Sequence, residues 1–269
     1  SYTITATNTG GSDSASIYIE VLNSGGTLTV TPTHSTVSVN STLASIAASY
    51  SHSLTIPSWT SGVTNTSVEI NNTASVAGTA IAAWDNGNLA IAWTRPIYGG
   101  TTQHVLALST YDGSSWTTQD IDTSSRTGYR PSIAIDNQGA LHIAYLDRDN
   151  TNLRYATNAS GSWVLSTLDN SSVNPSNEAA KTGIAIDNRG HVHIIHPVQG
   201  SSVWVLNYTT NVSGSFVSTT ITDTTKDDGK YASLAIAGNG SLHISVYRDS
   251  GGSDLRYYTD ESGVWTNET

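Results

Sequence analysis

The segment Asp136-Asn-Gln-Gly-Ala-Leu-His-Ile-Ala-Tyr145 decides the fold, because closely similar segments stand at three other places along the chain. Those segments are Asp85-Asn-Gly-Asn-Leu-Ala-Ile-Ala-Trp93, Asp187-Asn-Arg-Gly-His-Val-His-Ile-Ile-His196 and Ala237-Gly-Asn-Gly-Ser-Leu-His-Ile-Ser245. Their glycines, which are Gly87, Gly139, Gly190 and Gly240, are 52, 51 and 50 residues apart. A fixed period of this length indicates a repeat architecture in which each repeat is one supersecondary unit.

A second set of positions follows in each repeat. A Leu-x-Leu/Tyr-x-Thr run begins at Leu106, Leu153, Leu206 and Leu255, and an aromatic residue follows each run at Trp116, Trp163, Phe216 and Trp265. Alternation within the runs predicts strands, and the Gly-containing stretches between them predict hairpin turns with glycine in the left-handed conformation. An alanine recurs in the first run, at Ala83, Ala134, Ala185 and Ala235, where blades crowd towards an axis. The sequence therefore predicts an all-β chain that folds as a β-propeller. We expect at least four blades, each with four antiparallel strands and about 51 residues.

This repeat resembles the β-propeller repeats of sialidase-like and related bacterial and archaeal surface proteins. Their blades read Ser-x-Ala-x-Asp-x-x-Gly-x-x-His-Ile-x-Tyr, then Leu-x-Tyr, then Gly-x-Trp. The resemblance covers about residues 73–269, and it implies the fold while saying little about chemistry. Two arrangements fit the four visible blades: a ring closed by an earlier strand within residues 58–70, or further blades beyond Thr269.

Residues 1–22 do not follow the repeat. Two alternating runs, residues 2–8 and 14–22, flank a Thr-Gly-Gly-Ser-Asp turn and predict a β-hairpin. The hairpin resembles the last two strands of the immunoglobulin-like modules of bacterial and archaeal surface proteins. Because two strands are not a stable domain, we expect a partner sheet from the same chain, or from another copy by strand addition. Residues 23–72, rich in Ser, Thr, Asn and Gly, are expected to form connecting strands.

Composition excludes several classes of protein. With 11 basic against 21 acidic side chains and a net charge of −10, the chain lacks the basic surface that nucleic acid binding requires. The absence of cysteine excludes disulfide scaffolds, Cys-ligated zinc and thiol catalysis. The apolar stretches are too short for a membrane span. The high Ser and Thr content is typical of secreted β proteins, so we expect an extracellular or cell-surface location.

Nine Asn-x-Ser/Thr sequons make a glycoprotein possible. The glycosylation candidates are Asn40, Asn65, Asn71, Asn158, Asn170, Asn207, Asn211, Asn239 and Asn267.

Metal chemistry has two candidate sites, and both have a structural interpretation. One histidine per repeat, at His142, His193 and His243, suggests hydrogen bonding within the repeat more than a ligand set. The side chains of Asp147, Asp149 and Thr151 offer alternating oxygens that calcium accepts. That stretch lacks a tight-turn glycine and a bidentate glutamate, which favours an Asx-rich hairpin turn. We therefore expect no cofactor, with calcium as the weak alternative.

A sialidase-like glycoside hydrolase is the enzymatic alternative. It would require an arginine cluster, a tyrosine nucleophile with a glutamate partner, and an aspartate acid/base. The stretch Tyr129-Arg130-Pro131 resembles the Phe/Tyr-Arg-Ile-Pro signature of those enzymes but is one residue short. Arg154 and Arg256 stand at equivalent repeat positions, which indicates a structural role.

Tryptophans offer the remaining candidates. Trp116, Trp163 and Trp265 hold one repeat column and are expected in the core, whereas Trp59 and Trp204 lie outside the aromatic columns. The latter two are the candidates for stacking on a sugar. The sequence predicts a non-catalytic extracellular or cell-surface β-propeller for adhesion, recognition, or surface or filament assembly. A glycan-binding, lectin-like module is the alternative, ahead of the hydrolase.

Overall fold

The computed structural model describes residues 2–8, 11–17, 78–97, 103–124, 126–171, 179–200, 203–249 and 253–268. The expected connecting strands of residues 23–72, and with them the candidate closing strand within residues 58–70, lie outside these ranges. The chain separates into two compact units, Ser1–Gly62 and Val63–Thr269. No helix long and apolar enough to cross a membrane occurs among the described residues.

The first unit contains the predicted hairpin. Strand β1 (Tyr2–Asn8) pairs antiparallel with β2 (Gly11–Ile17), so that Tyr2 lies opposite Ile17 and Asn8 opposite Gly11. The second strand begins three residues earlier than the sequence predicts. Its small and polar start, Gly-Ser-Asp, is typical of a turn, but the pairing of Asn8 with Gly11 includes it in the ladder.

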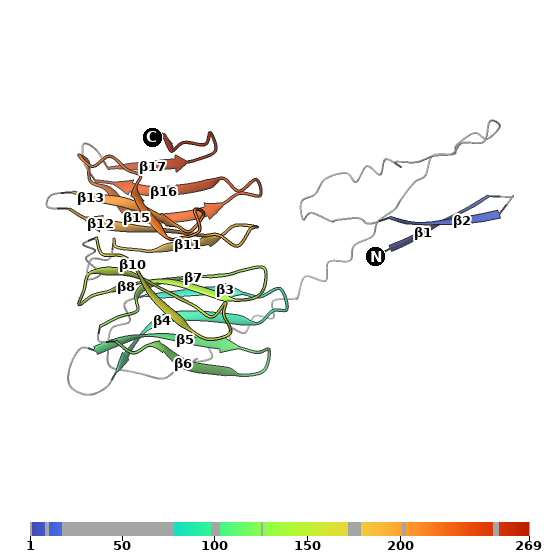
Figure 1. The fold of residues 1–269 in the computed structure, drawn as a ribbon, viewed down its shortest axis with the longest axis horizontal. Coiled ribbons are helices and arrows are strands. Elements are labelled where there is room, and N and C mark those ends of the chain that lie inside the picture. The colour runs from blue at the N-terminus through green and yellow to red at the C-terminus, as the bar shows by residue number, and fades with distance from the viewer. Residues whose placement is uncertain are drawn as a thin grey trace, which may run out of the picture. The chain divides into compact units, whose positions relative to one another are not determined.

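The second unit consists of β-sheets, and each repeat supplies four antiparallel strands, here named blades 1 to 4 (Figure 1). Blade 1 contains β3 (Thr79–Ala83), β4 (Leu89–Ile97), β5 (Gln103–Tyr111) and β6 (Trp116–Asp122). Blade 2 contains β7 (Tyr129–Ile135), β8 (Leu141–Asp147), β9 (Asn152–Thr157) and β10 (Val164–Asp169). Blade 3 contains β11 (Gly183–Ile186), β12 (Val192–Gln199), β13 (Trp204–Thr210) and β14 (Val217–Thr220). Blade 4 contains β15 (Asp228–Ile236), β16 (Leu242–Arg248), β17 (Asp254–Thr259) and β18 (Thr266–Glu268).

The four repeat glycines adopt the left-handed conformation that the turns require. Their φ angles are 87°, 84°, 84° and 88°, in the order Gly87, Gly139, Gly190 and Gly240. The amide of Gly139 donates to the Asp136 carbonyl, and that of Gly87 donates to Trp84. Trp84, not Asp85, is therefore the blade 1 counterpart of Asp136.

The alanine column needs the same one-residue correction in blade 1. Ala82 pairs with Ala90 in the register in which Ala134 pairs with His142, so Ala82 holds the repeat position. Ala83 is exposed.

The blades stack in chain order, and their first strands, β3, β7, β11 and β15, follow one another side by side (Figure 1). Alternation along each strand gives every blade two apolar faces, so a core forms at each junction between blades. The junctions bury a leucine of one blade with an isoleucine of the next, at 0% exposure, in the pairs Leu106 and Ile143, Leu153 and Ile194, and Leu206 and Ile244. Side-chain packing between blades therefore holds the row together.

Main-chain contacts reinforce two junctions. Strand β13 pairs parallel with β15 at Val205 and Asp228, which joins blades 3 and 4 into one eight-stranded sheet. A side chain at Gly229 would place its Cβ 2.5 Å from the carbonyl carbon of Val205. At Gly128, at the entrance to blade 2, an added Cβ would likewise lie 2.5 Å from the Leu106 amide nitrogen. Only glycine, which has no Cβ, fits where two backbones approach this closely.

The described blades form an open row. Ile81 on blade 1 is 63% exposed and Leu255 on blade 4 is 72% exposed, although both stand in columns that interior junctions cover. The sheets fit propeller blades, but the described residues do not close a ring.

Candidate functional site

The histidine column is structural in blades 2 to 4. Each imidazole Nδ1 lies 2.5–2.6 Å from a tyrosine hydroxyl of the next strand, in the pairs His142 and Tyr155, His193 and Tyr208, and His243 and Tyr257. In blade 2 the other ring nitrogen lies 3.1 Å from a carboxylate oxygen of Asp136. Burial raises the pKa of Tyr155 to about 12 and lowers that of His193. These contacts agree with the predicted hydrogen-bonding role, and no cluster of metal-ligating side chains occurs in the described parts of the chain.

Blade 1 departs from this pattern at the positions of the aspartate, the histidine and the tyrosine. Trp84, Ala90 and Leu108 replace the aspartate, histidine and tyrosine of blade 2. No polar pair can form between Ala90 and Leu108. The Trp84 indole instead reaches across the junction and donates to the Gly139 carbonyl of blade 2 at 2.9 Å.

A groove of about 360 Å³ lies where blade 1 departs from the repeat, between blades 1 and 2. We call it the blade 1–2 groove. Three aromatic side chains line it, Trp84, Tyr111 and Trp163, with the amide and carboxylate side chains of Asn86, Asn88, Asp112, Gln119 and Asn158. Leu108, Thr110 and Leu141 complete the lining. The sequence places Trp163 in the core and Asn158 among the sequons, but it does not predict that the lining residues share a groove, because their meeting depends on the register between two blades.

Several polar groups of the groove are held in place. The Asn158 carboxamide oxygen accepts from the Leu141 amide at 2.7 Å, which leaves the side-chain NH₂ as a donor. The Asn86 carboxamide oxygen accepts from the Asn88 amide at 3.0 Å. The Tyr111 ring lies 5.2 Å from the Trp116 ring. These contacts orient the groove before any ligand arrives.

Asp112 supplies the negative charge of the groove. Its Oδ1 accepts from the backbone amides of Ser115 and Ser114, at 2.8 Å each, and from the Ser114 hydroxyl. These hydrogen bonds, led by that of the Ser115 amide, hold the pKa of Asp112 well below its usual range. The carboxylate is ionised near neutral pH and can accept hydrogen bonds from hydroxyl groups.

The lining combines aromatic surface with amide donors and acceptors, and it contains no basic side chain. Aromatic surface and fixed polar groups together suit a ligand that has apolar patches and many hydroxyl groups. An anionic ligand would meet Asp112 without a compensating cation. The groove is therefore better suited to a neutral polar ligand.

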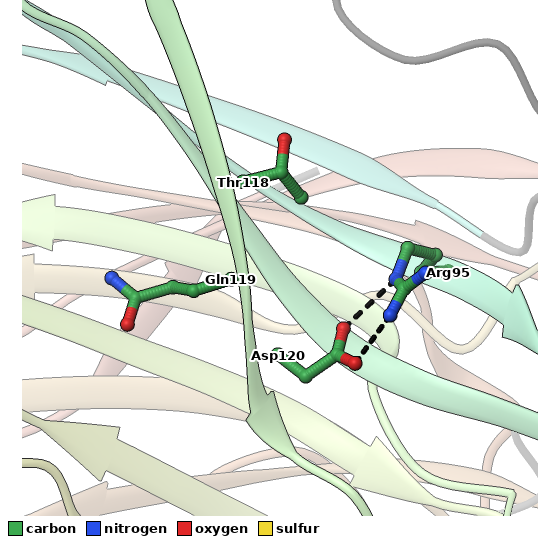
Figure 2. Close-up of a pocket in the computed structure, with 4 residues that line it drawn as sticks. All are labelled: Arg95, Thr118, Gln119 and Asp120. Atoms are coloured by element: carbon green, nitrogen blue, oxygen red, sulfur yellow. Dashed lines mark hydrogen bonds and ion pairs between the residues drawn. The ribbon is translucent and has the colours of Figure 1, made fainter.

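A second hollow, of about 300 Å³, lies on blade 1 beside Arg95, Thr118, Gln119 and Asp120. The Arg95 guanidinium forms a two-bond ion pair with the Asp120 carboxylate (Figure 2). The pair joins β4 to β6, and the Gln119 side chain points away from it (Figure 2). Because the two charges face each other, this hollow offers little net charge to a ligand.

Buried carboxylates cross two of the junctions between blades. Asp169, at the end of blade 2, accepts from Nε2 of His196 at 3.0 Å and from Nδ2 of Asn207 at 2.9 Å, both in blade 3. Burial opposes ionisation of Asp169, but the hydrogen bonds from His196, Ser171 and Asn207 outweigh it and hold its pKa far below the usual range. Sequence reasoning missed this contact.

The equivalent contact joins blades 1 and 2. Asp122 accepts from the Tyr145 hydroxyl at 2.7 Å, and the Arg154 guanidinium lies 3.4 Å away. Burial is the largest influence on the pKa of Asp122, but the hydrogen bonds from Tyr145 and Ser124 prevail and lower it. Arg154 thus has the structural role that its repeat position indicates.

Of the two predicted sugar-stacking tryptophans, Trp204 is not part of this groove. Trp204 is 6% exposed and belongs to the core between blades 2 and 3, so its ring faces are not open to a ligand. Its position at the start of β13 places it on the inward side of the strand. Trp59 lies outside the described residues. In the repeat column, Trp163 packs against the core of blades 1 and 2, and Trp265 against that of blades 3 and 4.

The weak calcium candidates form a turn. Oδ1 of Asp147, a residue 1% exposed, accepts from the amides of Asp149 and Asn150 at 3.0 and 3.1 Å, and Oδ2 accepts from the Asn150 side chain. Thr151 has a φ of 54° in the same turn. The Asp149 carboxylate pairs with Arg126. These contacts match the predicted Asx-rich turn.

The residues that resemble a sialidase signature are also engaged within the protein. Tyr129 is 3% exposed, and its hydroxyl lies 2.8 Å from Nδ1 of His104. The Arg148 guanidinium stacks over the Tyr129 ring at 5.6 Å. Arg130 has a φ of 50° at the bend that opens blade 2.

The sequons differ in accessibility. Asn207 is 6% exposed and donates to Asp169, so glycosylation there is incompatible with the folded junction. Asn158 and Asn211 are half-buried and accept main-chain hydrogen bonds. The exposed described sequons are Asn170, Asn239 and Asn267, whereas Asn40, Asn65 and Asn71 lie outside the described residues.

The fold and the junction packing define an all-β protein of propeller-like blades, and two solved structures support this. The chain is similar to a protein of unknown function from Dyadobacter fermentans, with a TM-score of 0.53 and 13% identity over 72% of this chain and 68% of that one. It is also similar to an α-L-arabinanase from Penicillium chrysogenum complexed with arabinobiose, with a TM-score of 0.51 and 12% identity over 72% and 66% of the two chains. A fucose lectin from Kordia zhangzhouensis in complex with methyl-fucoside matches at a TM-score of 0.37 and 17% identity, over 52% and 97%.

At these identities the likeness extends to the fold alone. No protein-family model matches the chain, and no curated protein matches it.

Proposed function

We propose that this chain is a non-catalytic extracellular or cell-surface recognition module that binds a neutral glycan in the blade 1–2 groove. The observation that carries the proposal is the meeting of Trp84, Tyr111 and Trp163 with five amide or carboxylate side chains in one groove. A blade that lacks the repeat's histidine and tyrosine borders this groove. The proposed function is glycan recognition, through which the protein mediates adhesion.

The chemistry of a sugar matches both the aromatic surface and the polar side chains of the groove. The C–H face of a pyranose or furanose ring is apolar and can stack on Tyr111 or Trp84, while its hydroxyls both donate and accept. The Asn158 amide group and the Asp112 carboxylate provide a fixed donor and a fixed acceptor. The arabinanase shares the fold and was solved with arabinobiose, so a sugar is one ligand that such a fold holds.

The hydrolase alternative has less support. In the described ranges the glutamates, Glu261 and Glu268, are exposed in blade 4. The arginines near the sialidase-like stretch are engaged, Arg126 with Asp149 and Arg148 with the Tyr129 ring. These contacts use the groups that a sialidase-type centre would need for its substrate.

The N-terminal hairpin fits a surface location in the same proposal. We infer that β1 and β2 are the end of an immunoglobulin-like module and present the propeller at a surface, or join copies by strand addition. The exposed sequons are consistent with secretion.

A panel of immobilised neutral and anionic oligosaccharides tests the proposed function. We expect fluorescently labelled protein to bind a subset of neutral glycans and to leave sialylated and uronic-acid glycans unbound. A Tyr111→Ala variant should lose the signal, whereas Tyr231→Ala, which removes a half-exposed tyrosine of blade 4, should keep it. Retention of binding by Tyr111→Ala, or hydrolysis of the bound glycan, would contradict the proposal.

A further inference from the structure

One repeat position supplies a side-chain oxygen to the main chain in blades 2, 3 and 4. There Oδ1 accepts from the first main-chain amide of the second strand, at 2.7 or 2.8 Å, in the pairs Asn158 and Leu141, Asn211 and Val192, and Asp260 and Leu242. An aspartate serves as well as an asparagine, because the contact uses only an oxygen. The Nδ2 group of Asn158 takes no part in it, and no described residue accepts a hydrogen bond from this group.

Blade 1 has a tyrosine at the same repeat position. Tyr111 follows the Leu-x-Leu-x-Thr run of blade 1 as Asn158 follows the corresponding run of blade 2, and it pairs with Leu89, the first residue of β4. Its hydroxyl donates to the Gly113 carbonyl at 2.9 Å. Tyr111 and Asn158 both line the blade 1–2 groove. The groove therefore lies between two copies of one repeat position, of which one presents an aromatic ring and the other an amide donor.

Two leucines form the apolar part of the groove, and hydrogen-bonding groups of both blades accompany them. Leu108 is 1% exposed and Leu141 is 3% exposed, and both line the groove. Because Asn158 binds the Leu141 amide, its Nδ2 donor belongs to the blade 2 side. On the blade 1 side, two backbone amides occupy Oδ1 of Asp112, whereas Oδ2 has only a 3.3 Å contact with the Ser115 hydroxyl. The groove thus offers a donor, an acceptor and apolar surface together.

We propose that the groove selects glycans that contain an N-acetylated amino sugar, an inference that rests on the proposed function and narrows it to one class of neutral glycan. The acetamido carbonyl accepts from Nδ2 of Asn158, and the acetamido N–H donates to Oδ2 of Asp112. The methyl group packs on Leu108 and Leu141, while the sugar ring stacks on Tyr111. A hydroxyl group at the same carbon lacks the apolar part, and a protonated amine offers no acceptor to the amide.

Isothermal titration of the full chain with matched oligosaccharides tests the selection. The probes are trimers of equal linkage that carry a hydroxyl, an acetamido or an amino group at carbon 2, in both the gluco and the galacto series. In at least one series the N-acetylated trimer should bind about tenfold more tightly than the other two. Equal binding of the hydroxyl trimer, or tighter binding of the amino trimer, would overturn the inference and leave glycan recognition standing. Failure of every neutral glycan to bind would contradict the proposed function and the inference with it.

Asn158→Asp separates the amide donor from the structural contact. The variant keeps an oxygen for the Leu141 amide, as Asp260 does for Leu242, so its urea midpoint should stay close to that of wild type. Loss of Nδ2 should lower affinity for the N-acetylated trimer about tenfold and reduce its advantage over the hydroxyl trimer. Asn211→Asp makes the same change outside the groove and should bind as wild type does. Unchanged selectivity in folded Asn158→Asp, or an equal loss in both variants, would overturn the assigned contact.

Discussion

The Trp84 indole donates a hydrogen bond to the Gly139 carbonyl at 2.9 Å, across the junction between blades 1 and 2. The bond replaces the carboxylate–histidine contact that Asp136 makes within blade 2. It ties one wall of the blade 1–2 groove to the turn of the neighbouring blade. The groove therefore forms at the junction between blade 1, which lacks the aspartate, histidine and tyrosine of the repeat, and blade 2, which has them.

Loss of the Trp84 indole N–H should weaken both glycan binding and stability. A Trp84→Phe variant keeps aromatic surface but loses the bond to Gly139, and we expect glycan affinity to fall several-fold while the free energy of unfolding changes by about 1 kcal/mol. Isothermal titration and urea unfolding measure the two quantities. Equal affinity of variant and wild type would show that the bond does not orient the groove.

Asp169 should contribute strongly to stability because its partners are buried. Asp169→Ala leaves His196 and Asn207 without their acceptor, and we expect a loss of about 3 kcal/mol in urea unfolding. Asp120→Ala breaks the more exposed pair with Arg95 and should cost no more than about 1 kcal/mol. Similar losses for the two variants would contradict the assigned role of the junction carboxylate.

Stability should fall in acid in two stages. Burial lowers the pKa of His193, so the unfolded chain binds a proton first as pH falls through about 6.5. The pKa of Asp169 is also lowered, so its contribution is complete above the unfolded value of about 3.9 and is lost as pH falls below it. Urea midpoints from pH 8 to pH 3 should show both stages in wild type and a shallower acid stage in Asp169→Asn. Parallel profiles would refute the assignment to Asp169.

The close approach at Gly128 should tolerate no side chain. Its φ is +78°, and a Cβ would lie 2.5 Å from the Leu106 amide nitrogen, so Gly128→Ala should cost about 3 kcal/mol or more. Gly161 has a φ of +85° but open space around it, and Gly161→Ala should cost only about 1 kcal/mol. Thermal or urea unfolding of Gly128→Ala and Gly161→Ala measures both losses of stability. The difference between them is the cost of the steric clash beyond that of the backbone strain.

The repeat made the blades predictable. Spacing and turn glycines place the four blades correctly because each hairpin depends on local alternation and on a glycine such as Gly139. The one-residue shift in blade 1 arose because Asp85 resembles the repeat aspartate although Trp84 occupies its place. Local sequence similarity cannot distinguish these two registers.

The candidate site was not predictable in the same way. Tyr111 and Asn158 are 47 residues apart and meet only because blade 2 stacks on blade 1. Trp204 illustrates the opposite error: it lies outside the aromatic columns, yet the start of β13 faces the core. A departure from the repeat, such as Ala90 in the histidine column, was the sequence signal that could have located the groove.

The most direct test of the account is a titration of the full chain with the best neutral glycan from the panel, followed by isothermal calorimetry and by NMR of the tryptophan indole signals. We expect the indole resonances of Trp84 and Trp163 to shift and Tyr111→Ala to weaken affinity about tenfold, while Tyr231→Ala leaves it unchanged. Binding that shifts neither indole and survives Tyr111→Ala would place the glycan elsewhere and contradict the assignment of the groove.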